Sequence, residues 1–235
     1  MSTTETKRSL RDAIADAEAF RAMFPPDSYS RWEIAGSVRR RVAMVGDVEH
    51  VIIPVVGEFT KGGGLFAETE KRNLFLHHLD ELVRTYQMKK HVYPNGSNRW
   101  GEKYRGVDFC GHCHEIFLAT PQNWGSTLAI RTGPGEFSKS LVIALQRNGY
   151  WQNEGSTYNK RAMSCSCGWS GKAAMTAEIS ELDHKPRFTN GNERPLICPS
   201  CRRGDQLAME RVEVATEEQY FRLCGMNWIE PEKRR

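Results

Sequence analysis

The chain has 235 residues, of which 39% are hydrophobic and 26% charged, and its formal net charge is +4. This length suits one large domain or two small ones, and the composition is that of a globular protein. No apolar run reaches the ~18 residues of a membrane span, and the first residues lack the apolar core of a signal peptide. We therefore expect a cytoplasmic protein, and the mild basic excess permits a polyanionic partner without requiring one.

Helix and strand signals both occur along the chain, so we expect a fold that contains both kinds of element. Capping signals at Ser9 with Asp12 and at Thr216 with Gln219 mark two helix starts. The β-branched run from residue 45 predicts a strand. In chain order we expect a helix over 9–24, a strand over 31–35, a turn at Gly36-Ser37, a short helix within 38–44, a strand over 45–56, a loop over 57–66, a helix over 68–88, a β-hairpin around 110–113, a helix over 136–149 and a helix after residue 216.

Two acids, Asp47 and Glu49, stand one residue apart in the predicted strand 45–56. Residues two apart in a strand project from the same face, so these carboxylates would lie side by side and repel each other. A divalent cation relieves such repulsion, and Mg²⁺ is commonly held by one or two carboxylates together with substrate phosphates. The alternative is a strand edge with both charges in water, and the acid pair alone does not decide between the two.

The residues before the acids favour the metal site. Gly36-Ser37 begins a turn ahead of the predicted short helix, and Arg39 and Arg40 follow within the next turn. Backbone N–H groups at a helix N-terminus, a serine hydroxyl and an arginine suit a triphosphate. An anion cradle beside metal-binding acids indicates phosphoryl or nucleotidyl transfer.

These motifs resemble the signature of family X DNA polymerases, the DNA polymerase β-like nucleotidyltransferases. G-S-x-R-R over 36–40 is followed by G-D-x-E over 46–49. The stretch HEIFLATPQNWGSTLAIRTGPGEFSKSL (114–141) is similar to the family's third-acid strand, its P-x-x-aromatic-G turn and its T-G motif. TEEQYFRLCGMNWIEPEKRR (216–235) is similar to the family's C-terminal motif. The resemblance covers about residues 9–160 and 210–235, and four motifs in the same order make it specific.

The resemblance implies a set of site residues. Asp47, Glu49 and Glu115 would be metal-binding carboxylates, and Glu115 would also be the candidate base for the primer 3′-hydroxyl. It implies two Mg²⁺ or Mn²⁺ ions, a (d)NTP, and a DNA primer end or gapped DNA as partners. The implied nucleotide-binding residues are Gly36, Ser37 and Arg40 at the β- and γ-phosphates, Gly46 in the acid motif, Thr132 and Gly133 at the sugar and base, and Ser138 facing the base.

The sequence departs from the family pattern in three ways. Glu49 and Glu115 stand where the family usually has aspartates, so each carboxylate is one methylene further from the backbone. Ile130-Arg131 replaces the usual aromatic pair before Thr-Gly, which leaves ribonucleotide use open. The family's amino-terminal lyase and helix-hairpin-helix region is missing, so we expect no deoxyribose-phosphate lyase activity. This compact form resembles those carried by bacteriophages.

The predicted hairpin around 110–113 offers two alternatives to these assignments. Asp108 competes with Glu115 as third acid, but the spacing of Glu115 to the following Trp-Gly fits the family motif better. Cys110 and Cys113 form a C-x₂-C pair, yet a second metal site there would need two further ligands. We favour Glu115 and an ordinary hairpin turn.

Seven cysteines in a cytosolic-looking chain argue against a disulfide framework. Four of them form two close pairs, Cys165 with Cys167 and Cys198 with Cys201. Two such pairs can close a tetrahedral Zn²⁺ site, and four thiolates without an open position make the zinc structural. The alternative is four cysteines in a core.

Cations interleaved with rings predict contacts to a nucleic-acid backbone and bases, although a solvated loop fits equally well. The predicted contacts are Arg99, Trp100, Lys103 and Arg105 in the loop before the third-acid strand, and Arg202 and Arg203 after the last cysteine.

We therefore expect an α+β fold with a nucleotidyltransferase palm containing a mixed sheet over 1–125. A small C-terminal α/β nucleotide-binding subdomain would cover 126–235, with a zinc-ribbon insertion over 161–209. The expected activity is addition of nucleoside monophosphates to a DNA 3′-hydroxyl in repair or replication, by a monomer in the cytoplasm, or in the host cytoplasm if phage-encoded. Two rivals stay open: transfer to RNA or protein hydroxyls, and a catalytically silent protein that binds nucleic acid.

Overall fold

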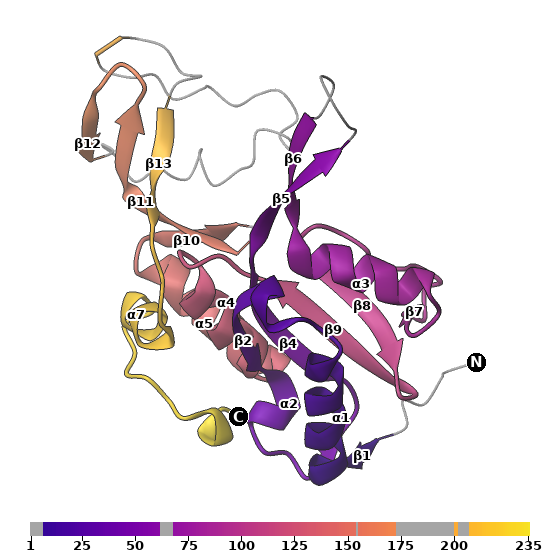
Figure 1. Cartoon of the computed structure of the whole chain (residues 1–235). Helices are drawn as coiled ribbons and strands as arrows, with labels where there is room; N and C mark the ends of the chain where they lie inside the picture. The colour runs from indigo at the N-terminus through magenta and orange to yellow at the C-terminus, as the bar shows by residue number, and fades with distance from the viewer. Residues whose placement is uncertain (1–6, 62–67, 154, 173–199, 202–206) are drawn as a thin grey trace.

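The computed structural model describes residues 7–61, 68–153, 155–172, 200–201 and 207–235 (Figure 1). Its centre is a mixed sheet with the strand order β2-β4-β9-β8-β7. β4 and β9 run parallel, and the other neighbours are antiparallel, which confirms the predicted α+β class. The strands are β2 (Tyr29–Ile34), β4 (Val48–Pro54), β7 (Lys89–Lys90), β8 (Tyr104–Phe109) and β9 (His112–Leu118).

Helices cover both faces of this sheet, so β4 and β9 bury apolar side chains on both sides. Ile52 and Ile116 belong to a core with α1 (Leu10–Ala22) and α3 (Leu74–Arg84). Val51 and Phe117 face the opposite way and pack with α4 (Trp124–Thr132). Figure 1 shows α1 and α3 on one side of the sheet and α4 on the other. Because side chains alternate along a strand, Glu49 projects toward the α4 side.

Several local predictions are confirmed. The predicted hairpin joins β8 to β9 through Cys110 and Gly111, whose φ angles of 51° and 79° are the left-handed pair that a type I′ turn requires. The Ser9 hydroxyl accepts the first capping hydrogen bond of α1, and Thr216 with Gln219 forms a complete capping box at α7 (Glu217–Leu223). The helix predicted over 136–149 is α5 (Gly135–Arg147).

The helix predicted over 68–88 is wrong in its first part, which is a strand. β5 (Val56–Lys61) and β6 (Glu68–Asn73) pair antiparallel, so the predicted loop over 57–66 also begins as a strand. The pairing places Lys71 opposite Glu58, with 4.0 Å between Nζ and Oε1. The backbone pairing of all six residues of β6 with β5 overrides the helix propensity of the charged residues. The helix α3 starts only after Asn73, whose side chain accepts from the Leu76 N–H at 3.0 Å.

The strand predicted over 45–56 is interrupted, because Gly46 and Asp47 form a bend between β3 (Met44–Val45) and β4. β3 pairs with β1 (Arg8–Ser9) rather than with the central sheet, so the chain must turn before β4 begins. The short helix expected within 38–44 is α2 (Gly36–Arg39), which starts at the predicted turn itself.

The C-terminal half builds a second core. Leu141 and Leu145 of α5 pack with Tyr220 and Phe221 of α7. The helix α4, which the sequence patterns did not predict, contributes to this core and to the one beneath the sheet, so the division at residue 125 stays a prediction. A second sheet contains β10 (Tyr150–Asn153), β11 (Ser156–Cys165), β12 (Ser170–Lys172) and β13 (Leu207–Val212). Short 3₁₀ turns lie at Pro26–Ser28 and Pro231–Lys233, and no described helix has the length and apolar character needed to cross a membrane.

A buried chain of hydrogen bonds lies on the sheet face opposite the acids. The Trp32 Nε1–H donates to His50 Nδ1 at 3.1 Å, and His50 Nε2 contacts His114 Nδ1 at 3.0 Å. Because the indole can only donate, the His50 proton lies on Nε2 and is donated to His114. Burial lowers the pKa of both histidines, that of His114 to about 3, so both rings are neutral at physiological pH. Glu49 precedes His50 in β4 and Glu115 follows His114 in β9, so each acid is next to a histidine that this buried network holds in place.

Candidate active site

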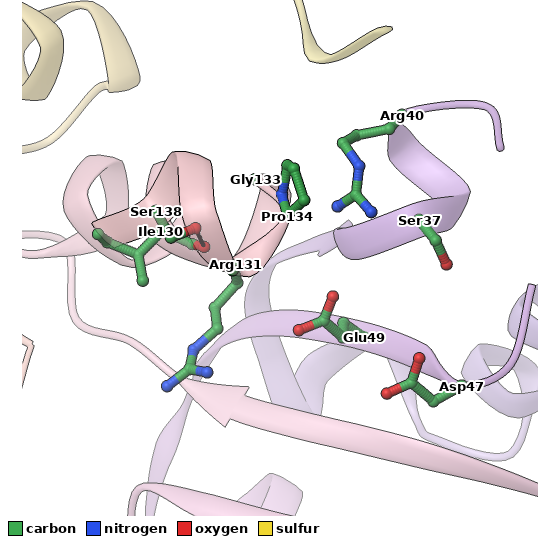
Figure 2. Close-up of a pocket in the computed structure, with 10 residues that line it drawn as sticks. Ser37, Arg40, Asp47, Glu49, Ile130, Arg131, Gly133, Pro134 and Ser138 are labelled. Atoms are coloured by element: carbon green, nitrogen blue, oxygen red, sulfur yellow. Dashed lines mark hydrogen bonds between the residues drawn. The ribbon is translucent and has the colours of Figure 1, made fainter. Parts of the chain in front are cut away.

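The parallel pairing of β4 and β9 brings two of the predicted acids together. Glu49 and Glu115 are partners in the register of these strands. Asp47 lies in the bend one residue before β4, and its carboxylate points to the same region as that of Glu49 (Figure 2). Asp108 lies elsewhere, since it pairs with His91 at 2.7 Å between Oδ1 and Nδ1. The third acid beside the pair is therefore Glu115.

A close approach of Glu49 to α2 explains the glycine of the G-S motif. Gly36 has φ 60°, and a Cβ there would lie 1.9 Å from Glu49 Oε2. Glycine adopts this left-handed conformation without strain and leaves room for the carboxylate. The G-S turn and the acid are thus a single packed unit, although thirteen positions separate them in the chain.

The electrostatics of the three acids fit a divalent cation. Burial, together with the negative charges of Asp47 and Glu115, raises the pKa of Glu49 to about 8, against the opposing charges of Arg131 and Arg40. A carboxyl held at such a pKa is destabilised as an anion and gains from a cation next to it. Carboxylate oxygens are the donors that Mg²⁺ and Mn²⁺ prefer. Asp47, Glu49 and Glu115 are the described residues that would hold such ions.

A pocket of about 310 Å³ opens beside the acids (Figure 2). This volume is at the lower end of the range for small-molecule sites. The Ser37 hydroxyl lines it and has no hydrogen-bond partner among the described residues, although the oxygen is buried. Buried hydroxyls are normally bonded, so this one is available to a ligand. The lining residues are Ser37, Arg40, Asp47, Glu49, Ile130, Arg131, Gly133, Pro134, Gly135 and Ser138.

Four of the seven predicted nucleotide-binding residues line this pocket, namely Ser37, Arg40, Gly133 and Ser138, whereas Gly36, Gly46 and Thr132 do not. The Thr132 side chain is buried and its hydroxyl accepts a hydrogen bond from Arg39 Nη1 at 2.7 Å, so it faces away from the pocket. Arg40 donates to the Thr132 carbonyl at 2.6 Å, which ties α2 to the end of α4. Ser138 lines the pocket, with its hydroxyl donated to the Ile130 carbonyl at 2.6 Å.

Arg131 is a site residue that the sequence patterns did not select. Its guanidinium lies over the Phe117 ring at 3.9 Å, and its charge opposes the rise in the pKa of Glu49. Figure 2 shows the side chain reaching from α4 past the carboxylate of Glu49. The sequence did contain one sign of its importance: Arg131 directly precedes Thr132-Gly133, a position where the resembling family usually has an aromatic residue.

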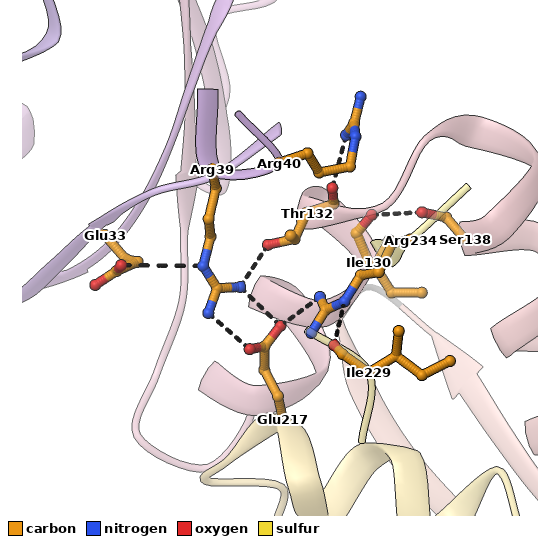
Figure 3. A network of polar contacts seen from close by, with 9 residues as sticks. All are labelled: Glu33, Arg39, Arg40, Ile130, Thr132, Ser138, Glu217, Ile229 and Arg234. Atoms are coloured by element: carbon orange, nitrogen blue, oxygen red, sulfur yellow. Dashed lines mark hydrogen bonds and ion pairs between the residues drawn. The ribbon is translucent and has the colours of Figure 1, made fainter. Parts of the chain in front are cut away.

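A buried ion-pair network joins the two halves of the site (Figure 3). Glu217 of α7 accepts from Arg39 at 2.8 and 2.7 Å and from Arg234 at 2.7 Å. Burial would raise the pKa of Glu217, but the hydrogen bonds from the two arginines outweigh it and hold this pKa below its usual range. The network connects α2, which carries Ser37, to α4 and to the C-terminal residues, so it sets how the pocket walls meet.

The predicted nucleic-acid contacts in the basic loop before β8 differ in how exposed they are and in what they contact. Arg105 is only 6% exposed and pairs with Asp80 at 2.6 Å, so its guanidinium already has a partner within the protein, and the nucleic-acid contact expected of it stays a prediction. Trp100 lies between Lys90 and Arg105, each 4.5 Å from its ring. Arg99 and Lys103 are exposed, whereas the predicted contacts Arg202 and Arg203 lie outside the described residues.

Three of the four predicted zinc ligands come together at the end of the second sheet. The thiol sulfurs of Cys165, Cys167 and Cys201 all lie within 4.8 Å of one another. Cys198 lies outside the described residues. The C-x-C pair sits in the turn between β11 and β12, where Gly168 has φ 91°. The described residues of the predicted zinc ribbon thus include a cysteine cluster beside β11, β12 and β13, and the zinc ribbon itself stays a prediction.

No protein-family model and no curated protein matches this sequence. Solved structures do match, and they have the DNA polymerase β-like fold. Leishmania infantum polymerase beta in a ternary P/T complex is 17% identical, with a TM-score of 0.60 over 98% of this chain and 77% of that chain. Its ternary gap complex is 16% identical, with a TM-score of 0.62 over 97% of this chain and 71% of that chain. At these identities the comparison shows the fold, and the chemistry depends on the site described above.

Proposed function

We propose that the protein is a nucleotidyltransferase that adds nucleoside monophosphates from a (d)NTP to the 3′-hydroxyl of DNA. The observation that carries the proposal is that Asp47 and Glu49 line the pocket, while the β4–β9 pairing puts Glu115 next to Glu49. The matching structures are polymerase beta complexes with primer and template or with gapped DNA, which supports DNA as the acceptor.

In the proposed reaction a bond forms between the 3′-oxygen and the α-phosphorus, and the bond to the β-phosphate oxygen breaks to release pyrophosphate. The proton of the 3′-hydroxyl passes to a base, for which Glu115 is the candidate. Mg²⁺ or Mn²⁺ held by the three acids would stabilise the charge that develops on the phosphate oxygens. Ser37 and Arg40 supply a hydroxyl and a cation to the phosphates, and Gly133 and Ser138 line the part of the pocket proposed for the nucleoside. Arg99 and Lys103 are the proposed described contacts to the DNA backbone.

Primer extension with Mg²⁺ or Mn²⁺ tests this function, using single-stranded primer, templated primer and one-nucleotide-gapped duplex, each with dNTPs and with NTPs. We expect dNTP incorporation that falls about 10³-fold or more in Asp47→Ala, since a lost metal ligand removes several kcal/mol of transition-state stabilisation. Glu18→Ala, an exposed acid on α1, is the matched control and should keep full activity. Transfer only to RNA or protein would favour the first rival, and no incorporation on any substrate would contradict the proposal.

We also propose that Cys165, Cys167 and Cys201, with Cys198 as the fourth ligand predicted from the sequence, bind a structural Zn²⁺. The Cys165 and Cys201 sulfurs are 3.7 Å apart, far beyond a disulfide bond. With Zn–S bonds of about 2.3 Å, a tetrahedral site has sulfur–sulfur edges of about 3.8 Å. β11 pairs with β12 and with β13 up to Cys165, and none of the hydrophobic clusters formed by the described residues includes a residue of β11 or β12, so a bound metal would add a cross-link at the tip of these strands.

Metal analysis of the purified protein is expected to give about one zinc per chain, from the single cluster found among the described residues. Cys165→Ser should lose the zinc and expose the β11–β12 turn to limited proteolysis. Cys110→Ser, at the exposed turn between β8 and β9, should retain it. Zinc that stays bound in Cys165→Ser, or a wild type that takes up none on reconstitution, would show that the cluster is not a metal site.

A further inference from the structure

Two tyrosine side chains bind the carboxylate of Glu115. The Tyr93 hydroxyl lies 3.0 Å from Glu115 Oε1, and the Tyr104 hydroxyl donates to the same oxygen. The two phenols also contact each other. Neither residue belongs to the motifs that suggested the active site, and neither lines the pocket.

The surrounding strands are built to hold this pair. Tyr104 is the first residue of β8, and its ring stacks on Phe117 with 4.7 Å between centroids. Gly106 stands directly opposite Glu115 in the β8–β9 register. A Cβ on Gly106 would lie 2.6 Å from the Tyr93 hydroxyl, so the glycine leaves the space that this phenol fills.

The pair is covered from outside by Arg99, whose guanidinium lies 4.3 Å from the Tyr93 ring and 5.5 Å from the Tyr104 ring. A phenol hydroxyl carries a proton that it can donate, and both hydroxyls lie within hydrogen-bond reach of Glu115 Oε1. Each hydroxyl has one proton. Tyr104 therefore donates to Glu115, and Tyr93 donates either to the same carboxylate oxygen or to the Tyr104 hydroxyl.

We propose that Tyr93 and Tyr104 are positioning residues for Glu115. The inference rests on the proposed function. A glutamate has one more rotatable bond than an aspartate, and fixing it costs conformational entropy each time the site is assembled. The phenols hold Oε1 and so pre-set the carboxylate, which leaves Oε2 as the oxygen for a cation or for the 3′-hydroxyl proton. This arrangement lets a longer acid serve where the resembling family uses a shorter one.

Tyr104→Phe and Tyr93→Phe test the proposal, because each removes one hydroxyl and keeps the ring. Groups that orient a metal ligand typically contribute 10–100-fold to metal affinity or activity. We expect Tyr104→Phe to weaken Mn²⁺ binding, measured by electron paramagnetic resonance, and to lower kcat by about 10-fold, with little change in KM for the dNTP. The variant with both Tyr93→Phe and Tyr104→Phe should show a larger loss of Mn²⁺ affinity and of kcat than either single variant. Tyr86→Phe, at a residue 88% exposed, is the matched control.

A double-mutant cycle with Glu115→Gln separates positioning from general support of the fold. If the phenols act through Glu115, Tyr104→Phe should have almost no further effect on Mn²⁺ binding in the Glu115→Gln background. Gly106→Ala should reproduce the effect of Tyr93→Phe by displacing that hydroxyl. An undiminished effect in the Glu115→Gln background, or Tyr→Phe variants within twofold of wild type, would overturn the proposal.

Failure of the proposed function gives a different result. A wild type that incorporates no nucleotide contradicts that function, while the Mn²⁺ measurements on the same variants still decide whether the phenols position Glu115.

Discussion

Replacing Glu217 by alanine is expected to lower the free energy of unfolding by about 3–5 kcal/mol, the usual cost of leaving buried charges without their partner. Arg234 is 2% exposed and would lose its carboxylate in a site that water does not reach. Arg39 would lose two hydrogen bonds at the same time. Chemical denaturation of wild type and Glu217→Ala, with the zinc concentration and the buffer held constant, measures this difference in the free energy of unfolding.

The next residue provides the matched control for Glu217. Glu218 lies in the same first turn of α7 but is exposed, so Glu218→Ala should change stability by no more than about 0.5 kcal/mol. Because the network also joins α2 to α4, Glu217→Ala should reduce nucleotide incorporation under conditions where the variant is still folded. Equal stabilities of the two variants would show that the network contributes nothing to the folded state.

Replacing Glu49 by glutamine is expected to stabilise the metal-free protein at pH 8 by roughly 3–5 kcal/mol while abolishing cation binding. The folded-state pKa of Glu49 is about 8, against an ordinary value of 4.5. A pKa raised by folding means that the folded state binds the proton more tightly than the unfolded chain. The contribution of Glu49 is therefore fully present below pH 4.5 and is lost at about 1.4 kcal/mol per unit as pH rises toward 8. Glutamine cannot ionise and removes this loss.

The test is to measure the free energy of unfolding of wild type and Glu49→Gln at pH 5 and at pH 8, in the presence of a chelator. The difference between the two proteins should grow from pH 5 to pH 8. Glu18→Gln, at an exposed acid on α1, is the matched control and is measured under the same conditions. Cation binding must also displace the proton, so Mn²⁺ addition at pH 7 should release about nine-tenths of a proton per chain from Glu49. The same pH slope in Glu49→Gln and wild type would contradict the assignment of the buried proton to this residue.

Local patterns in the sequence were sufficient for features that depend on neighbouring residues. The capping box at Thr216 and Gln219 and the left-handed turn at Cys110 and Gly111 involve contacts within a few positions, so spacing and residue type predict them. The acid motif was visible for the same reason. The prediction of a helix over 68–88 was wrong in its first part because β6 pairs with β5. Local propensity contains no information about that pairing.

The pairing of distant segments changed the interpretation of several site residues. Arg105 and Thr132 carry groups suited to ligands, but Asp80 and Arg39 occupy those groups in the folded protein. Tyr93 carried no motif at all and reaches Glu115 only because Gly106 of the adjacent strand has no side chain. A buried polar group takes the partner that the packing provides, and that partner can stand anywhere in the chain.

The sequence by itself determined which chemical groups the protein carries: the acids, the G-S turn and the cysteine pairs, each defined by spacing along one segment. Only the tertiary structure decided which of these groups meet. Glu49 and Glu115 become neighbours through the parallel register of β4 and β9, and Gly36 meets Glu49 because α2 packs against that strand. Such contacts join residues far apart in the chain, and the free energy that selects them comes from burying the two faces of the sheet against α1, α3 and α4.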